Sequence, residues 1–357
     1  MINKEYQIYF EKLIHTVYAE GGSDLHLAEG RYPIIRVNGN LIPLVKEEVL
    51  SGEHIQAFLD ILLSPVNREK FTKEKEIDFS YSPMGVDARF RGNAYVQQGL
   101  VSIALRLILK VIRGLDELGL PPILESFAAK KQGFFLVVGP VGQGKSTTLA
   151  AMIELINRNR AEHIITIEDP IEYIYTQKKS IIDQREVRMD TADFYGALVS
   201  VLRQDVNVIL VGEMRNPETM VAAVTAAETG HLVLSTLHTN NAAQTIDRII
   251  DSFPSNQQDQ IRMQLSGSLI GIFSQRLVPR ISGGMIPVYE LLIVNSAVAN
   301  LIREKRSHEI SSVIETSSEI GMIDMNRMLA DLVRKGEITI ENAYLHSTNP
   351  KILEKML

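Results

Sequence analysis

The sequence predicts an α/β protein made of a small α+β domain and a larger domain with a mostly parallel sheet. Before residue 110, short strand patterns separated by turn residues alternate with two helical patterns. After residue 122, apolar strand patterns alternate with helical ones, as expected of a parallel sheet covered on both faces. The stretch between them is rich in glycine and proline and interrupts both patterns. We therefore expect domains at 1–110 and 123–357, joined by a linker at 111–122.

The composition is that of an ordinary globular chain. Of its 357 residues, 45% are hydrophobic and 22% charged, which argues against extended disorder. The net charge of −6 gives no support for nucleic-acid binding, so we expect no nucleic-acid partner. Without cysteine there are no disulfides, thiolate metal ligands or catalytic thiols. Neither a secretory signal nor an apolar window of about eighteen residues is visible, which predicts a cytoplasmic protein.

The small domain is expected to begin with an amphipathic helix, because apolar residues recur at helical spacing from about residue 2 to 18. An Asn38-Gly39 turn between two apolar runs is typical of a β-hairpin, since both residues tolerate positive φ. A second helix and further strands follow. The expected strands are 24–27, 34–37, 41–44, 77–81 and 86–96, and the second helix is 53–63.

The motif with the clearest chemistry is the stretch Gly139-Pro140-Val141-Gly142-Gln143-Gly144-Lys145-Ser146-Thr147-Thr148. It lies between an apolar strand pattern at 134–138 and a helical pattern at 149–156. Glycines let successive backbone N–H groups approach phosphate oxygens, and the start of a helix adds a favourable field. The pattern predicts a phosphate-binding loop, in which Lys145 reaches the β- and γ-phosphates and Ser146 ligates Mg²⁺. A glycine-rich turn without a ligand is the alternative, and the strand–loop–helix context argues against it.

The loop predicts that the protein binds a nucleotide together with Mg²⁺. The expected cofactor-binding residues are Gly139, Val141, Gly142, Gln143, Gly144, Lys145, Ser146 and Thr147.

Carboxylates follow two of the other expected strands. Glu168-Asp169-Pro170 follows the run 164–167, at the sheet edge where ligands bind in open α/β sheets. A solvated acidic loop is the alternative there. Gly212-Glu213 follows the run 208–211, where many P-loop ATPases carry an aspartate before the acid. Glu213 must then be the only acidic residue of this motif that holds Mg²⁺, in part through water.

Two histidines flank the expected strand 232–235. His238, after the strand, lies at the same edge as the two glutamates and is a candidate to sense the γ-phosphate. His231, before the strand, is expected to be structural. The helix after Glu213 is marked by Asn216 as N-cap, Pro217 in the first turn and Gly230 after its end. From about Thr239 the pattern is helical almost to the end of the chain.

These motifs, in this order, resemble those of the secretion ATPase superfamily, and within it the PilT-like retraction motors of type IV pili. The segments 139–148, 164–173, 208–215 and 229–240 are similar to the family's phosphate loop, aspartate box, VGEMR motif and histidine box. Arg203-Gln204-Asp205 lies at the family's LR-x-DP stretch, with Val206 in place of proline. The resemblance extends over nearly the whole chain.

The resemblance implies a PAS-like amino-terminal domain, a RecA-like ATPase domain and carboxyl-terminal helices. It implies that Glu168 is the general base or positions the water, Glu213 is the metal-linked acid and His238 the γ-phosphate sensor. Arg106 and the pair Arg89 and Arg91 resemble arginines that approach the phosphates from the small domain. For that pair, a solvent-facing strand edge is the alternative.

The resemblance also implies a homohexamer that hydrolyses ATP to do mechanical work. Its partner is an inner-membrane platform protein of the pilus, so the motor is peripheral to the inner face of the cytoplasmic membrane. Residues 297–304 are similar to the AIRNLIRE motif of retraction motors, although Val298 and Ala299 depart from it. A PilU-like accessory retraction ATPase is an alternative, as is an extension or type II secretion ATPase without the family's four-cysteine zinc module.

Overall fold

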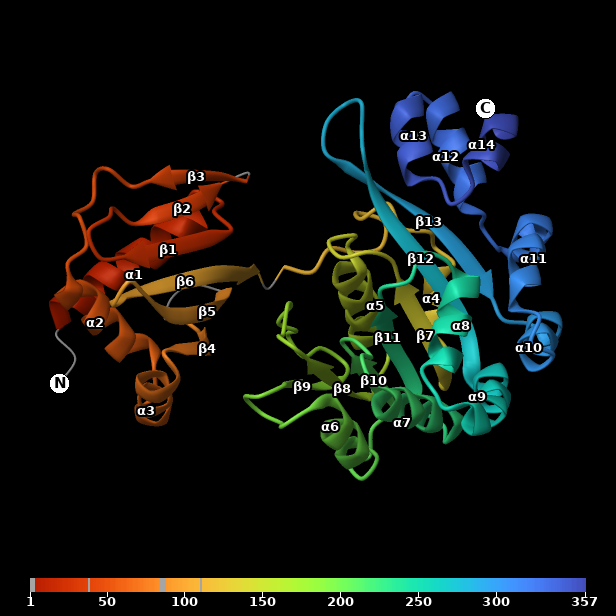
Figure 1. Ribbon diagram of the computed structural model, residues 1–357, viewed down its shortest axis with the longest axis horizontal. Helices are drawn as coiled ribbons and strands as arrows, with labels where there is room; N and C mark the ends of the chain where they lie inside the picture. Colours follow the sequence, from red (N-terminus) through yellow and green to blue (C-terminus); the bar gives the residue numbers. More distant parts are fainter. Residues whose placement is uncertain (1–3, 38, 84–87, 110) are drawn as a thin grey trace. The chain divides into compact units, whose positions relative to one another are not determined.

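The protein divides into two units, which Figure 1 shows as a ribbon of the computed structural model. The structure describes residues 4–37, 39–83, 88–109 and 111–357. The smaller unit extends to Val111 and includes Glu172–Ile174, and the larger unit comprises 112–171 and 175–357. Residues 112–122 therefore group with the larger unit. Each unit has a sheet and a core of its own.

The smaller unit is an antiparallel sheet with helices packed against it. Its strands follow the order β3-β2-β1-β6-β5-β4, and every neighbouring pair is antiparallel. The strands are β1 (Asp24–Ala28), β2 (Ile34–Val37), β3 (Asn40–Pro43), β4 (Glu76–Tyr81), β5 (Ala88–Gln97) and β6 (Leu100–Leu109). The helices are α1 (Lys4–Ala19), α2 (Gly52–Leu62) and α3 (Pro65–Glu74).

Local sequence explains where these helices begin. The hydroxyl of Ser51 accepts a hydrogen bond from the backbone of His54, whose ring accepts one from the backbone of Ser51, which makes a capping box for α2. Ser64 caps α3 and Pro65 occupies its first turn. Phe10, Phe58 and Phe90 are fully buried in the core between helices and sheet.

The expected strands and the helix near 53–63 are present, with ends shifted by one or two residues. Asn38 of the expected hairpin turn and residues 86–87 of the expected strand lie outside the described residues. The structure adds β6 and α3, which we did not predict. A central strand such as β6 is buried on one face by the helices, and its alternation is obscured because the other face carries the apolar Ala104 and Ile108 beside Arg106.

The larger unit contains a sheet in the order β13-β12-β7-β11-β10-β8-β9. All neighbouring pairs are parallel except β12 with β13. The strands are β7 (Gly133–Val138), β8 (His163–Glu168), β9 (Ile181–Glu186), β10 (Val208–Val211), β11 (Leu232–Leu237), β12 (Leu269–Pro279) and β13 (Met285–Ile293). Every residue of β7, β10 and β11 is buried, because helices cover both faces of a parallel sheet.

Helices connect and cover these strands (Figure 1). They are α4 (Leu124–Ala128), α5 (Lys145–Asn159), α6 (Phe194–Val201), α7 (Pro217–Glu228), α8 (Ala242–Asp251), α9 (Ser255–Ser268), α10 (Ser296–Arg303) and α11 (Ile310–Thr316). Asn216 caps α7 through its side chain and Pro217 lies in the first turn, as expected. Gly230 follows with a φ of 111°.

The expectation of helices throughout the region after Thr239 is wrong. The strands β12 and β13 form a long hairpin there, and β12 adds to the parallel sheet beside β7. Both strands are largely buried apolar runs, and periodicity alone does not separate a doubly buried strand from a buried helix. The helical pattern is correct for α8, α9 and the segment after β13.

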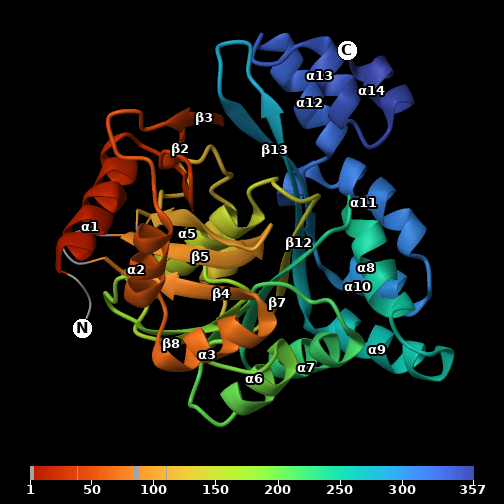
Figure 2. The ribbon, with the colours of Figure 1, turned by 60° about the vertical axis from the view of Figure 1, so that its left-hand side comes forward.

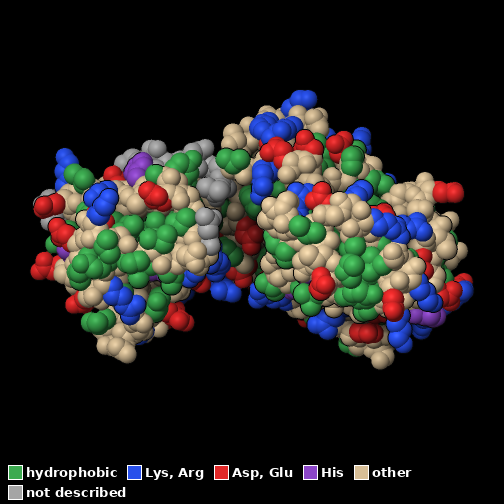
Figure 3. All heavy atoms as spheres, turned by 90° about the horizontal axis from the view of Figure 1, so that it is seen from above, with side chains coloured by type: hydrophobic (Ala, Val, Ile, Leu, Met, Phe, Trp, Pro, Cys, Tyr) green, Lys and Arg blue, Asp and Glu red, His purple; other side chains and the backbone are tan. Residues whose placement is uncertain are grey.

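The chain ends in a small group of helices on the β12–β13 hairpin (Figure 2). These are α12 (Met325–Arg334), α13 (Ile340–His346) and α14 (Pro350–Met356), preceded by 3₁₀ turns at Ser307–Glu309 and Ser318–Ile320. In the described part of the chain, no helix combines the length and the apolar character needed to span a bilayer. On the face of the larger unit drawn in Figure 3, basic and acidic side chains are interspersed.

Candidate nucleotide-binding site

The predicted phosphate loop connects β7 to the start of α5. Gly139, Gly142 and Gly144 have φ values of 145°, 79° and 78°, in the region that favours glycine. The Val141 side chain is 80% exposed, so this residue offers a phosphate only its backbone. The residues predicted to bind the cofactor thus form one continuous loop that leads into the positive end of a 15-residue helix.

The phosphate loop is packed closely against β12. A Cβ on Gly139 would lie 2.3 Å from the backbone oxygen of Gln275, and one on Gly144 would lie 2.9 Å from its side-chain nitrogen. Gly139 therefore meets two constraints at once, a positive φ and contact with a neighbouring backbone. Gln275 is a site residue that sequence reasoning missed, although a Ser-Gln-Arg triplet within an apolar run was a signal of special contacts.

Lys145, His238 and Glu213 form a line at the carboxyl end of the parallel strands. The buried Lys145 ammonium donates to the backbone oxygens of Gly139 and Pro140, at 2.8 and 2.7 Å, and lies 3.3 Å from His238 Nδ1. An ammonium only donates, so a hydrogen bond between these two groups has Nδ1 as its acceptor. His238 Nε2 lies 3.6 Å from Glu213 Oε2.

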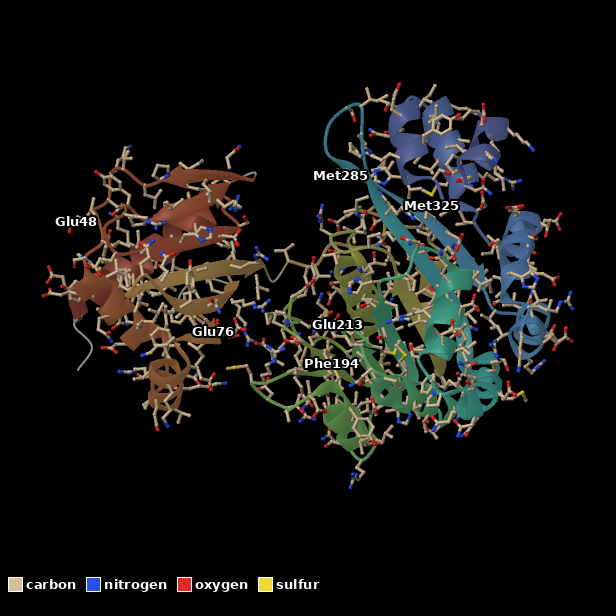
Figure 4. All side chains as sticks on the ribbon, in the orientation of Figure 1. Glu48, Glu76, Phe194, Glu213, Met285 and Met325 are labelled. Carbon is tan, nitrogen blue, oxygen red and sulfur yellow. The ribbon has the colours of Figure 1, made fainter. Side chains whose placement is uncertain are left out.

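Hydrogen bonds between β10 and β11 hold the two residues of this line that follow those strands. Thr236 Oγ1 donates to the backbone oxygen of Gly212 at 2.6 Å, and Ser235 Oγ donates to that of Val211 at 2.7 Å. Glu213 is the second residue after the end of β10 (Figure 4) and pairs with Arg215. The hydrogen bond with Glu213 raises the pKa of Arg215.

Glu168 is the last residue of β8 and is 8% exposed. Its Oε1 accepts hydrogen bonds from Thr166 Oγ1 at 2.7 Å and from Gln184 Nε2 at 3.5 Å, which orient the carboxylate. A Cβ on Gly212 would lie 3.4 Å from the Cα of Glu168. A larger residue at position 212 would therefore press on the backbone of β8 at Ile167 and Glu168.

The oxygen atoms at this site fit an Mg²⁺ ion that arrives bound to the nucleotide. Among the described residues, no three His, Asp or Glu side chains cluster as a metal cage. Mg²⁺ in nucleotide sites is held by one or two protein oxygens with phosphates and water. Ser146, in the first turn of α5, and Glu213, after β10, are hard oxygen donors of that kind.

The other histidine and the acidic loop have structural contacts. His231 Nδ1 lies 2.9 Å from the backbone oxygen of Ala226, at the end of α7, in agreement with its expected structural role. Asp169 pairs with Arg188 at 3.2 Å, and it directly follows Glu168.

Glu290, on β13, accepts a hydrogen bond from the first backbone N–H of α8, that of Ala242, at 2.8 Å. Burial raises the pKa of Glu290 to about 7.

The three predicted arginines lie on one sheet of the smaller unit. Arg91 on β5 is directly opposite Arg106 on β6, and Arg106 is opposite Asp24 on β1. Arg106 Nε donates to Asp24 at 2.9 Å, while its side chain remains 70% exposed. Arg91 has a partner on each side, Ser80 of β4 and Arg106 of β6, so it does not lie at a strand edge. Arg89, by contrast, pairs with Ile108 of β6 and lies past the last β5 residue that pairs with β4.

Residues 4–344 match the family described as type II/IV secretion system proteins. The chain belongs to this family. Among its relatives, the type IV pilus retraction ATPase PilT of Pseudomonas aeruginosa is 43% identical, covering 91% of this chain and 94% of the relative. The type IV pilus ATPase PilU of the same organism is also 43% identical, covering 98% and 91%.

A solved structure of the family, the pilus retraction motor PilT with bound ADP, superposes with a TM-score of 0.91. It is 44% identical and the match covers 97% of this chain and 98% of that one. The predicted family and fold class are confirmed.

Proposed function

We propose that this chain is the ATP-hydrolysing motor that retracts a type IV pilus. The observation that carries the proposal is the line of Lys145, His238 and Glu213, which come from the phosphate loop and two neighbouring parallel strands. The line supplies a cation for the phosphates, a ring that contacts this cation and a carboxylate for the metal. Relatives that match almost the full chain are named as pilus retraction motors, which supports this particular use of ATP.

The roles of the residues follow from their positions. The N–H groups of the phosphate loop and Lys145 bind the phosphates, and Ser146 and Glu213 hold Mg²⁺, which offsets phosphate charge. Glu168, held by Thr166, orients the attacking water and takes its proton. His238 contacts Lys145 and Glu213 together, so a shift of either is transmitted to the loop that follows it. Arg89, Arg91 and Arg106 add positive charge for the transition state.

Mechanical work requires that these groups assemble and separate with each turnover. The proposed assembly is a homohexamer in which the arginines reach the phosphates during turnover. The ring acts on a platform protein of the pilus at the inner face of the cytoplasmic membrane. No transmembrane segment of its own is needed for this attachment.

A deletion strain tests the proposed function. Loss of a retraction motor should leave many surface pili and no twitching, because assembly continues while disassembly stops. Pilus number is counted by electron microscopy, and retraction is followed with labelled pili. A strain without any pili would contradict the proposal and identify an extension or secretion motor. Complementation with the wild-type gene and with Lys145→Ala separates loss of ATP binding from loss of the protein.

An accessory retraction ATPase is a second candidate, favoured by the PilU match that spans nearly the whole chain. An accessory motor predicts a deletion strain that still retracts its pili when another retraction ATPase is present. The same labelled-pilus experiment decides, since the main motor predicts no retraction events.

A further inference from the structure

Gln275 is a buried polar residue that contacts the phosphate loop without lying in it. It belongs to β12, is 2% exposed, and uses both polar atoms of its side chain. Its Oε1 accepts a hydrogen bond from Thr148 Oγ1 at 2.6 Å, and its Nε2 donates one to the backbone oxygen of Gln143 at 2.7 Å. One side chain thus connects the first turn of α5 to the loop that precedes it.

The phosphate loop returns a second hydrogen bond to the same strand. Gln143 Oε1 accepts from the backbone N–H of Leu277 at 2.6 Å. Gln143 therefore faces β12 with both its side chain and its backbone oxygen. Together with the approach of Gly139 to the Gln275 backbone, two positions of the loop are held by two residues of β12, Gln275 and Leu277.

The geometry of the peptide bond connects these contacts to phosphate binding. In a trans peptide the C=O of one residue and the N–H of the next point in opposite directions. When Gln275 draws the Gln143 oxygen toward β12, the N–H of Gly144 is turned to the other side of the loop. Backbone N–H groups on that side are the ones that a phosphate loop presents to the nucleotide.

We propose that Gln275 is a positioning residue for nucleotide binding, which holds the Gln143–Gly144 peptide in its phosphate-binding orientation. The Thr148 hydroxyl has the supporting role of orienting the Gln275 amide, so that its nitrogen faces Gln143. A loop with several glycines has many accessible conformations, and restricting it beforehand lowers the ordering cost of binding. The inference rests on the nucleotide site of the proposed function.

The test uses the full-length protein and two variants of nearly unchanged shape. Gln275→Met keeps the length of the side chain and removes both hydrogen bonds, and Thr148→Val removes the hydroxyl that orients the amide. We expect Gln275→Met to bind fluorescent ADP about tenfold more weakly and Thr148→Val about threefold more weakly. The KM for ATP should rise in parallel, with kcat within about twofold of wild type.

The double variant is the decisive measurement. If Thr148 acts through Gln275, the double variant should bind nucleotide no more weakly than Gln275→Met alone. Asn326→Leu is the matched control, because it removes a buried amide that hydrogen-bonds to Ser347 at 2.6 Å among the carboxyl-terminal helices. A melting temperature measured for each variant shows whether the loss of stability is similar.

Several outcomes overturn the proposal. These are binding by Gln275→Met as tight as by the Asn326→Leu control, a fall in kcat without a change in affinity, and additive losses in the double variant. Should Gln275→Met not fold, Thr148→Val must still bind more weakly than the control. Wild-type protein that binds no nucleotide would contradict the proposed function instead, so the two failures are distinguishable.

Discussion

Glu168 is the last residue of β8 and Glu213 follows the neighbouring parallel strand β10, but the two carboxylates have different surroundings. Glu168 is buried and oriented by a hydroxyl, as suits a group that must meet one water in one geometry. Glu213 lies between Arg215 and His238 and is more exposed, as suits a ligand reached by a metal that arrives with the nucleotide.

Glu168→Gln separates binding from chemistry. The amide keeps the size of the side chain but takes no proton, so we expect kcat to fall by about 10²–10⁴ while nucleotide affinity stays close to wild type. Phosphate release and fluorescent-nucleotide titration measure the two quantities. Lys145→Ala is the companion variant and should abolish binding. A Glu168→Gln protein that turns over at the wild-type rate would remove Glu168 from the mechanism.

Gly212→Ala tests the close packing behind Glu168. The added Cβ would lie 3.3 Å from the Ile167 oxygen and 3.4 Å from the Glu168 Cα, so β8 must yield by a few tenths of an ångström. We expect kcat to fall about tenfold with nucleotide affinity nearly unchanged, since the shift moves the general base. Gly267→Ala is the control, because a Cβ there meets no atom within 4 Å. Equal activity of both variants would show that this packing is irrelevant to catalysis.

Glu290 makes the stability of the protein depend on pH. Its pKa is about 7 in the fold against 4.5 for an ordinary glutamate, because burial and Asp324 outweigh Arg276 and the hydrogen bond from Ala242. The folded state therefore holds a proton that the unfolded chain has released. The resulting stabilisation is complete below pH 4.5 and is lost as the pH rises through about 7, a change on the order of 3 kcal/mol.

Glu290→Gln removes this titration and keeps an oxygen for the Ala242 N–H. The melting temperature of the wild type should fall relative to that of the variant as the pH is raised from 5 to 8, in a series of scanning-calorimetry runs. A constant difference between the two proteins across this range would mean that Glu290 is ionised throughout.

Among the elements of the smaller unit, a row of charged residues crosses four strands of the sheet. Arg36, Asp24, Arg106 and Arg91 are successive partners across β2, β1, β6 and β5. Asp24 is 7% exposed and accepts hydrogen bonds from Ser23 Oγ at 2.7 Å and from Arg106 Nε at 2.9 Å. A single carboxylate thus fixes the orientation of an arginine that the family resemblance assigns to the nucleotide.

Asp24→Asn should lower the melting temperature, because the Arg106 guanidinium loses the carboxylate to which it donates. The amide turns a donor toward groups that are already donors, which costs about 1–3 kcal/mol in a buried setting. Glu69→Gln, which breaks an exposed i,i+4 pair with Lys73, is the control and should cost less than about 0.5 kcal/mol. A melting temperature equal to that of the control would show that the row contributes nothing to this sheet.

The elements differ in how well local sequence predicts them. The strand β7, the loop 139–144 and α5 follow from glycines, an apolar run and helical spacing, all within about twenty-five residues. The strands β12 and β13 were missed, because a strand buried on both faces has no alternation to mark it. With β12 unrecognised, Gln275 could not be placed against the loop, since that contact joins residues more than 120 positions apart.

At the scale of the whole molecule, the proposed motor is an assembly of chains with two units each. If the hexamer is correct, native mass spectrometry with Mg²⁺ and ATP should show a particle of six times the 39.9 kDa chain mass. Doping wild-type protein with Lys145→Ala subunits should then reduce ATPase activity more steeply than the wild-type fraction, because sites fire in a shared ring. A linear decline, or a monomer under all conditions, would contradict the proposed assembly.

The family, the phosphate-loop motif and the three strand ends at which Glu168, Glu213 and His238 lie could be predicted from the sequence alone. Those predictions succeeded because motif order and strand-end position are local properties, and the carboxyl ends of parallel strands meet at one edge. Only the tertiary structure decided that His238 connects Lys145 to Glu213, that Gly212 is packed against Glu168, and that β12 holds the phosphate loop. These contacts depend on sheet order and register, which bring distant residues together and leave no periodic signal in the chain.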